Sequence, residues 1–64
     1  MSRINLLLSR HNLPATDGYA LICVAEDYAR LMRTSVSNVL DGAIFSQSAA
    51  ERLIRVMRNR QNEA

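Results

Sequence analysis

The sequence predicts a small all-α domain of three or four helices. Apolar residues recur at intervals of three or four positions over most of the 64-residue chain, which is the spacing of amphipathic helices. Turn-forming residues separate these stretches, with Pro14 and Gly18 around one break and Gly42 at another. The length suffices for one domain only, so residues 1–64 are expected to fold as a single unit.

Residues 2–13 allow two interpretations. At helical spacing, one face collects four residues: Ile4, Leu7, Leu8 and His11. Ser2 would then be the N-cap of this helix. Residues 4–8 also suit a strand, because alternate positions collect three apolar residues: Ile4, Leu6 and Leu8. Pro14 ends the element in either case.

The second segment follows the turn PATDG, residues 14–18, in which Thr16 or Asp17 is expected to cap a helix. Six apolar residues then lie at helical spacing: Leu21, Val24, Ala25, Tyr28, Leu31 and Met32. Residues 19–25, YALICVA, are apolar on all sides and partly β-branched, so a buried strand is the alternative for them. We favour a helix throughout residues 19–32.

The third segment begins with RTSVSN, residues 33–38, where three hydroxyl-bearing side chains interrupt the apolar pattern. Thr34 or Ser35 is expected to cap a short helix that reaches about Leu40. Gly42 is expected just beyond the end of that helix. Residues 43–45, AIF, would then form an apolar connector that packs into the core.

Ser46 is expected to open the last helix, whose apolar side is supplied by six residues: Ala49, Ala50, Leu53, Ile54, Val56 and Met57. Arg52, Arg55 and Arg58 follow one another at intervals of three on a different face. Cations in this position also suit the C-terminal end of a helix dipole. Residues 61–64 are expected to be a disordered tail.

The composition argues against an enzyme. The chain has a single His, His11, and a single Cys, Cys23, with neither a CxxC nor an HxxxH pair. His11 has no acidic neighbour in the sequence, and Glu26 and Asp27 would point about 100° apart on a helix. A glycine-rich phosphate loop is also missing. We therefore expect no catalytic, cofactor-binding or metal-binding residues.

Size and charge indicate the partners. A chain of this length buries only about 60% of its unfolded surface, and one Cys excludes an internal disulfide, so a homodimer or docking onto another protein is expected. All eight basic residues are Arg, a side chain that binds phosphates and guanine edges well.

The apolar run at residues 6–8 is too short for a secretory core or a membrane span. An unpaired Cys suits a reducing compartment, so a cytoplasmic protein is expected.

Residues 27–57 resemble the DNA-binding headpiece of lactose-repressor-type transcription regulators. The helix-turn-helix of that family opens with Asp-x-Ala-Arg-Leu, as DYARL does at residues 27–31. Its recognition helix ends in Val-Ser-Arg-Val-Leu-Asn-Gly, which is similar to VSNVLDG at residues 36–42. A third helix of the family begins at Ser and contains Glu-Arg, as do Ser46 and residues 51–53 here.

This resemblance implies a recognition helix whose first turn enters the major groove of DNA. The chain is three residues shorter than the family between the first two blocks, and Met32 or Arg33 stands where the family has Gly. Together with the arginines of the last helix, the residues expected to contact DNA are Arg33, Ser35, Ser37, Asn38, Arg52 and Arg55.

Residues 33–44, RTSVSNVLDGAI, are also similar to ribbon-helix-helix repressors, in which an Arg/Gly-x-Ser-x-Ser turn opens the second helix. Residues 2–9 would be the strand, and Arg3 and Asn5 would read the groove from a dimer. The gap over residues 10–18 is longer than in that family. This second resemblance implies an α+β dimer as the alternative to an all-α helix-turn-helix domain.

Both resemblances imply sequence-specific DNA binding by a dimer. We therefore expect a small transcriptional regulator of the phage or plasmid type, which represses by occluding a promoter. The alternative is a protein-interaction module, such as an antitoxin or an inhibitor of a host enzyme. An apolar content of 48% favours that alternative, because a monomer of this size leaves some of those side chains exposed.

Overall fold

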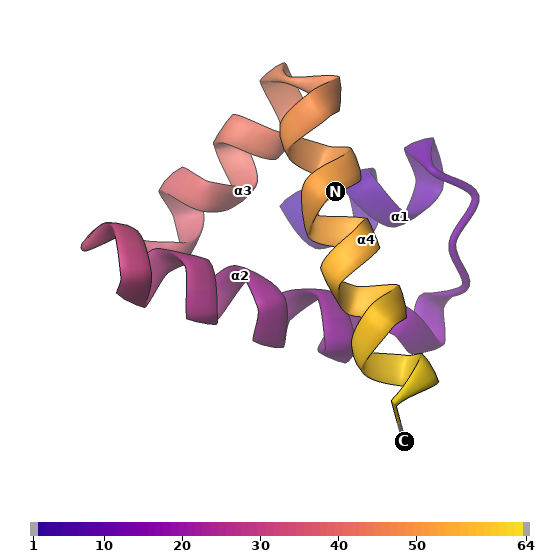
Figure 1. Cartoon of the computed structure of the whole chain (residues 1–64). Coiled ribbons are helices and arrows are strands. Elements are labelled where there is room, and N and C mark those ends of the chain that lie inside the picture. Colours follow the sequence, from indigo (N-terminus) through magenta and orange to yellow (C-terminus); the bar gives the residue numbers. More distant parts are fainter. Residues whose placement is uncertain (1, 64) are drawn as a thin grey trace.

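The computed structural model describes residues 2–63 as four α-helices and one short 3-10 helix (Figure 1). In chain order the elements are α1 (Arg3–Arg10), η1 (Ala15–Asp17), α2 (Gly18–Met32), α3 (Val36–Phe45) and α4 (Gln47–Asn62). The predicted all-α class is confirmed. Strands over residues 4–8 or 19–25, and with them the α+β ribbon-helix-helix alternative, are wrong, since both stretches are helical.

The burial pattern of α1 explains why it is a helix and not a strand. Leu7 and Leu8 are buried and Ile4 is half-buried, whereas a strand would have hidden Leu6 and exposed Leu7. Ser2 is the N-cap, as predicted, because its Oγ accepts a hydrogen bond from the backbone N–H of Asn5 at 3.1 Å.

The helix α2 begins without the predicted side-chain cap. The 3-10 turn η1 leads directly into it, so Asp17 already has helical dihedral angles (φ −82°, ψ −5°) and makes no capping hydrogen bond. The Asp17 carboxylate accepts instead from the side-chain amide of Gln61 in α4, at 3.0 Å. The contact therefore joins the start of α2 to the end of α4.

The apolar stripe of α2 is buried along its first part only. Leu21, Val24 and Ala25 are buried, as the helical spacing predicts, but Leu31 and Met32 are 82% and 67% exposed. The last turn of α2 projects beyond α4 to the edge of the fold, where α3 begins (Figure 1). Few side chains are available there to cover it, and Ala29 is the last residue of α2 that is buried.

The helix α3 is longer than predicted. It continues through Gly42, which has no positive φ, to Phe45, so the predicted helix end at Gly42 and the predicted connector over residues 43–45 are wrong. Leu40 and Ala43 face the core, and Phe45 lies about 140° from Leu40 around the helix. Phe45 is therefore 87% exposed and not in the core, while Ile44 is half-buried.

The corner between α3 and α4 consists of one residue. Ser46 has extended dihedral angles (φ −136°, ψ 114°) and is both the C-cap of α3 and the N-cap of α4. Its Oγ accepts from the backbone N–H of Ala49 at 3.4 Å, so the predicted start of the last helix is confirmed. The helix includes Gln61 and Asn62 of the expected tail, and Ala64 lies outside the described residues.

The core lies where α2, α3 and α4 meet, with α1 packed on α2 and α3 (Figure 1). The buried side chains of residues 2–63 are all apolar, and the largest fully buried ones are Leu7, Leu21, Val24 and Met57. The radius of gyration is 10.7 Å, which is about what a compact chain of this length has. None of the helices within this part of the chain is both long and apolar enough to cross a membrane.

Candidate functional site

The turn between α2 and α3 consists of residues 33–35. Arg33 has left-handed dihedral angles (φ 53°, ψ 49°). The N–H of Thr34 donates to the carbonyl oxygen of Ala29 at 2.9 Å, and the N–H of Arg33 donates to that of Arg30 at 3.3 Å. These two bonds form the helix end in which Gly is usual at the left-handed position. Arg33 thus occupies the left-handed position of the turn, and its side chain is exposed.

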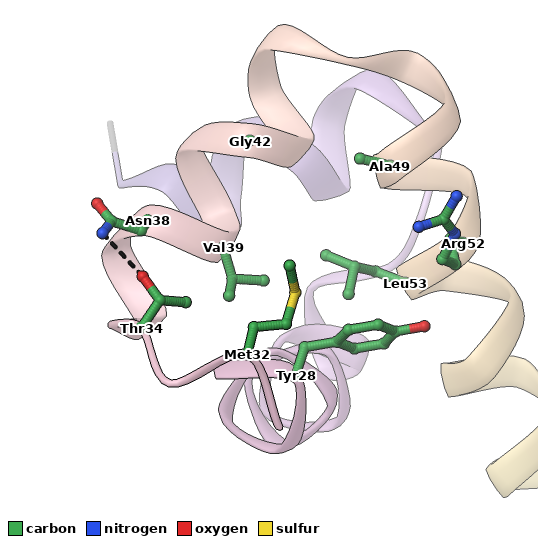
Figure 2. A pocket seen from close by; sticks show the side chains of 9 residues that line it. All are labelled: Tyr28, Met32, Thr34, Asn38, Val39, Gly42, Ala49, Arg52 and Leu53. Carbon is green, nitrogen blue, oxygen red and sulfur yellow. Dashed lines mark hydrogen bonds between the residues drawn. The ribbon is translucent and has the colours of Figure 1, made fainter. Parts of the chain in front are cut away.

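The first turn of α3 carries the polar residues that the sequence singled out. The Oγ of Ser35 accepts from the backbone N–H of Asn38 at 3.1 Å, so Ser35, and not Thr34, is the N-cap of α3. The side-chain amide of Asn38 donates to the Oγ1 of Thr34 at 2.9 Å (Figure 2). Ser35, Ser37 and Asn38 are all exposed. The hydroxyl of Ser35 is therefore occupied by capping, whereas Ser37 and Asn38 face solvent.

The eight arginines divide into two groups. Four make contacts within the fold: Arg3 with Asp41, Arg30 and Arg60 with Asp27, and Arg10 with the carbonyl oxygen of Ile44. The hydrogen bond from Arg60, assisted by Arg30, holds the pKa of Asp27 below its ordinary value of 3.8. Within residues 2–63 the other four have no carboxylate at ion-pair distance: Arg33, Arg52, Arg55 and Arg58.

A groove of about 340 Å³ lies between α2, α3 and α4. Its apolar walls come mainly from four side chains: Tyr28, Met32, Val39 and Leu53. Asn38 and Arg52, both predicted to contact DNA, lie at this groove together with Thr34. Figure 2 shows the Thr34–Asn38 pair at one end of the groove, and Arg52 with the phenol of Tyr28 at the opposite end. We call it the α2–α4 groove.

Arg55 belongs to a different surface. It lines a second groove, of about 490 Å³, together with His11, Glu51 and Arg58. Glu51 precedes Arg55 by four positions on α4, a spacing at which opposite charges attract. The structure thus brings Asn38 and Arg52 to one groove and separates Arg55 from them.

Several exposed apolar side chains were not expected on the surface. Phe45 was predicted to be in the core, and Leu31 and Met32 belong to the apolar stripe predicted for α2; Tyr19 is a fourth, 78% exposed. One feature of the sequence is related to the α2–α4 groove: Gly42 and Ala49 line it and are too small to fill it. Predicting the groove from that feature requires knowing that the two residues lie on facing helices.

Residues 2–63 contain no group of three His, Cys, Asp or Glu side chains that could hold a metal ion. The neighbouring side chain of Cys23 raises the pKa of the Tyr19 phenol above its ordinary value of 10.0, and the charge of Glu26 raises it further.

Near the start of α3 the fold thus brings together a short turn, Arg33, and the exposed side chains of Ser37 and Asn38. Arg52 lies at the other end of the α2–α4 groove, and neither Arg33 nor Arg52 has a carboxylate at ion-pair distance within residues 2–63. The left-handed position of the turn, where Gly is usual at a helix end, is occupied by Arg33. Comparison of the chain with protein-family models, curated proteins and solved structures gave no match.

Proposed function

We propose that the chain is a small cytoplasmic DNA-binding regulator that acts as a dimer, with α2, the turn at residues 33–35 and α3 as a helix-turn-helix. Three residues join the two helices, which is within the usual length of such a turn. The observation that carries the proposal is the exposure of Ser37 and Asn38 at the start of α3, with Arg33 just before them and Arg52 across the α2–α4 groove. No carboxylate of the described residues lies at ion-pair distance from either arginine.

Each of these side chains suits one part of a DNA duplex. An Asn amide pairs with the N6 and N7 atoms of adenine, and a Ser hydroxyl bonds to a base edge or a phosphate. Arg33 precedes α3 and Arg52 lies across the groove from it, so both are suited to phosphates on either side of the bases. Asp41 would repel phosphates from α3, but its charge is compensated by the ion pair with Arg3.

DNA binding is tested by fluorescence anisotropy of short random-sequence duplexes at about 50 and 200 mM salt. We expect binding that weakens as salt increases, because each neutralised phosphate releases counterions. Selection from the same random pool should then enrich a palindromic sequence, as a symmetric dimer requires. No binding at the lower salt concentration would refute the proposal.

Single substitutions separate the expected roles. Arg33→Gln and Arg52→Gln should each weaken binding to all sequences and reduce the slope of log affinity against log salt by about one. Asn38→Ala should change the enriched sequence with little effect on that slope. Arg55→Gln is the matched control, because Arg55 is an exposed arginine of α4 that lies on the second groove. An equal loss in Arg52→Gln and Arg55→Gln would contradict the assignment.

A protein-interaction module is the second candidate, favoured by the exposed apolar end of α2. Leu31 and Met32 are adjacent there, and both are largely exposed. A protein partner that covers them would be lost in Leu31→Ser. Co-purification of a second protein with the wild-type chain and not with Leu31→Ser, in the absence of any DNA binding, would decide for this candidate.

A further inference from the structure

The α2–α4 groove has an apolar centre and polar ends. The side chains of Met32, Val39 and Leu53 converge on its middle in Figure 2, and Arg52 and the Tyr28 phenol lie at one end. A volume of about 340 Å³ is at the lower limit of the range in which small-molecule sites are found. The flexible thioether of Met32 is 67% exposed, so it can adjust to a bound molecule.

The space exists because α3 and α4 face each other here with small residues. Gly42 lies in the middle of α3, and a Cβ added to it would meet no atom within 4 Å. Ala49 lines the same groove from α4. Because Gly42 lines the groove, a side chain longer than Ala at this position would take up part of its space.

The charge of the groove is positive and concentrated at one end. Arg52 has no carboxylate at ion-pair distance within residues 2–63, and none of the residues that line the groove is acidic. A single guanidinium presents a planar pair of donors, which matches the two oxygens of one carboxylate. A doubly charged phosphate would need further cations, and the other end of the groove offers only the neutral pair Thr34 and Asn38.

We propose that the α2–α4 groove binds a small amphipathic carboxylate. Its apolar body lies between Met32, Val39 and Leu53, and its carboxylate accepts hydrogen bonds from Arg52. Binding of this ligand does not depend on DNA binding. One consequence rests on the proposed function: a ligand that occupies Arg52 lowers the affinity for DNA.

The test is an NMR titration of the ¹⁵N-labelled chain with octanoate, using octanol as an uncharged probe of the same length. We expect octanoate to shift the amide signals of Tyr28, Met32, Val39 and Leu53. Octanol should bind about tenfold more weakly, because it lacks the charge-assisted hydrogen bond to Arg52. Equal affinity for the two probes, or octanoate shifts that do not cluster at the groove, would overturn the proposal.

Two arginine variants provide the matched comparison. Arg52→Gln should weaken octanoate binding about tenfold and leave octanol binding unchanged, whereas Arg55→Gln should alter neither. Gly42→Leu should block both probes by filling the groove, and a native-like spectrum would establish that this variant folds. Equal loss of octanoate binding in the two arginine variants would mean that net charge attracts the probe, which overturns the site.

Dilution of the chain without any probe excludes a different occupant. Concentration-dependent shifts of the same four amide signals would mean that a second copy covers the groove, and the proposal would be wrong.

A chain that fails to bind DNA but binds octanoate through Arg52 would refute the proposed function alone. The two failures are therefore distinguishable.

Discussion

Arg60, in the last turns of α4, donates a hydrogen bond to the carboxylate of Asp27 in the middle of α2. Arg30 donates to the other oxygen of the same carboxylate from one turn further along α2. Asp27 and Arg60 are 33 positions apart in the sequence, so their contact holds the end of α4 against α2. It is an exposed contact, and its contribution to stability depends on both pH and salt.

Asp27→Asn should make the stability of the fold less sensitive to acid. Because the pKa of Asp27 is lowered in the folded state, the ionised carboxylate stabilises the fold fully above its ordinary pKa of 3.8. That stabilisation is lost as the pH falls through the lower, folded-state pKa. Urea unfolding should therefore show that wild type is more stable than Asp27→Asn at about pH 7, and that the difference narrows at about pH 3.

Salt provides an independent check on the same variant. At about 1 M NaCl the screening length falls to about 3 Å, so the difference between wild type and Asp27→Asn at neutral pH should shrink. A difference that is the same at all pH values and salt concentrations would show that the substitution acts through packing and not through the charge.

Arg33→Gly should stabilise the fold and weaken DNA binding. Arg33 has a positive φ of 53°, a conformation that costs a non-glycine residue about 1 kcal/mol or more. Replacement by Gly removes this cost, but Gly also has more conformational freedom in the unfolded chain, which offsets part of the gain in stability. We expect a net gain of about 0.5–1 kcal/mol, measured as an increase of several degrees in Tm. The loss of the guanidinium should at the same time lower the affinity for DNA.

The chain offers a matched control for this substitution. Asn12, after α1, has a φ of 55° and the same pattern of hydrogen bonds, from Leu13 to Leu8 and from Asn12 to Ser9. Asn tolerates the left-handed region better than Arg does, so Asn12→Gly should gain less. A gain in Arg33→Gly no larger than that in Asn12→Gly would contradict the assignment of strain to Arg33.

Gly42→Ala should stabilise the fold by about 0.5–1 kcal/mol, because Gly in the interior of a helix is unfavourable relative to Ala. Gly42 lies inside α3 and its added Cβ would have no neighbour within 4 Å. Thermal unfolding of the two proteins measures the difference. If Gly42 instead ended the helix with a positive φ, the substitution would destabilise the protein, so the sign of the change decides the extent of α3.

Ser35→Ala should cost about 1 kcal/mol of stability, because it removes the N-cap of α3. Ser37→Ala, at an exposed position in the first turn of the same helix, should change the stability by less than about 0.5 kcal/mol. Urea unfolding of both variants tests the difference. Similar effects of the two substitutions would mean that the hydroxyl of Ser35 does not cap α3 in solution.

The sequence identified the helices more reliably than their ends. Helical spacing found the buried residues of α4, and the three capping serines, Ser2, Ser35 and Ser46, marked the starts of α1, α3 and α4 correctly. The end of α3 was predicted wrongly at Gly42, because Gly often follows the end of a helix. The neighbouring residues do not show that Ala43 packs into the core and that the helix continues through it. Burial against α2 and α4 is a tertiary effect that local chemistry does not contain.

The candidate site was predictable only in part. The polar residues at the start of α3 stand out in the sequence, and three of them are exposed. The pairing of Asn38 with Arg52 at one groove, and the separation of Arg52 from Arg55, depend on how α4 is rotated against α3. A spacing of three on a helix places two residues about 60° apart, which is enough to direct them into different grooves.

The single-residue corner at Ser46 has a consequence for how homologous chains are able to differ in length. One inserted or deleted residue there would rotate α4 by about 100° around its axis, moving its apolar face off the hydrophobic core. The connection between α1 and α2 carries no such restriction, since it is longer and can take up a change of length without rotating either helix. Insertions and deletions inherited over evolution should therefore accumulate before Gly18 and be absent at Ser46.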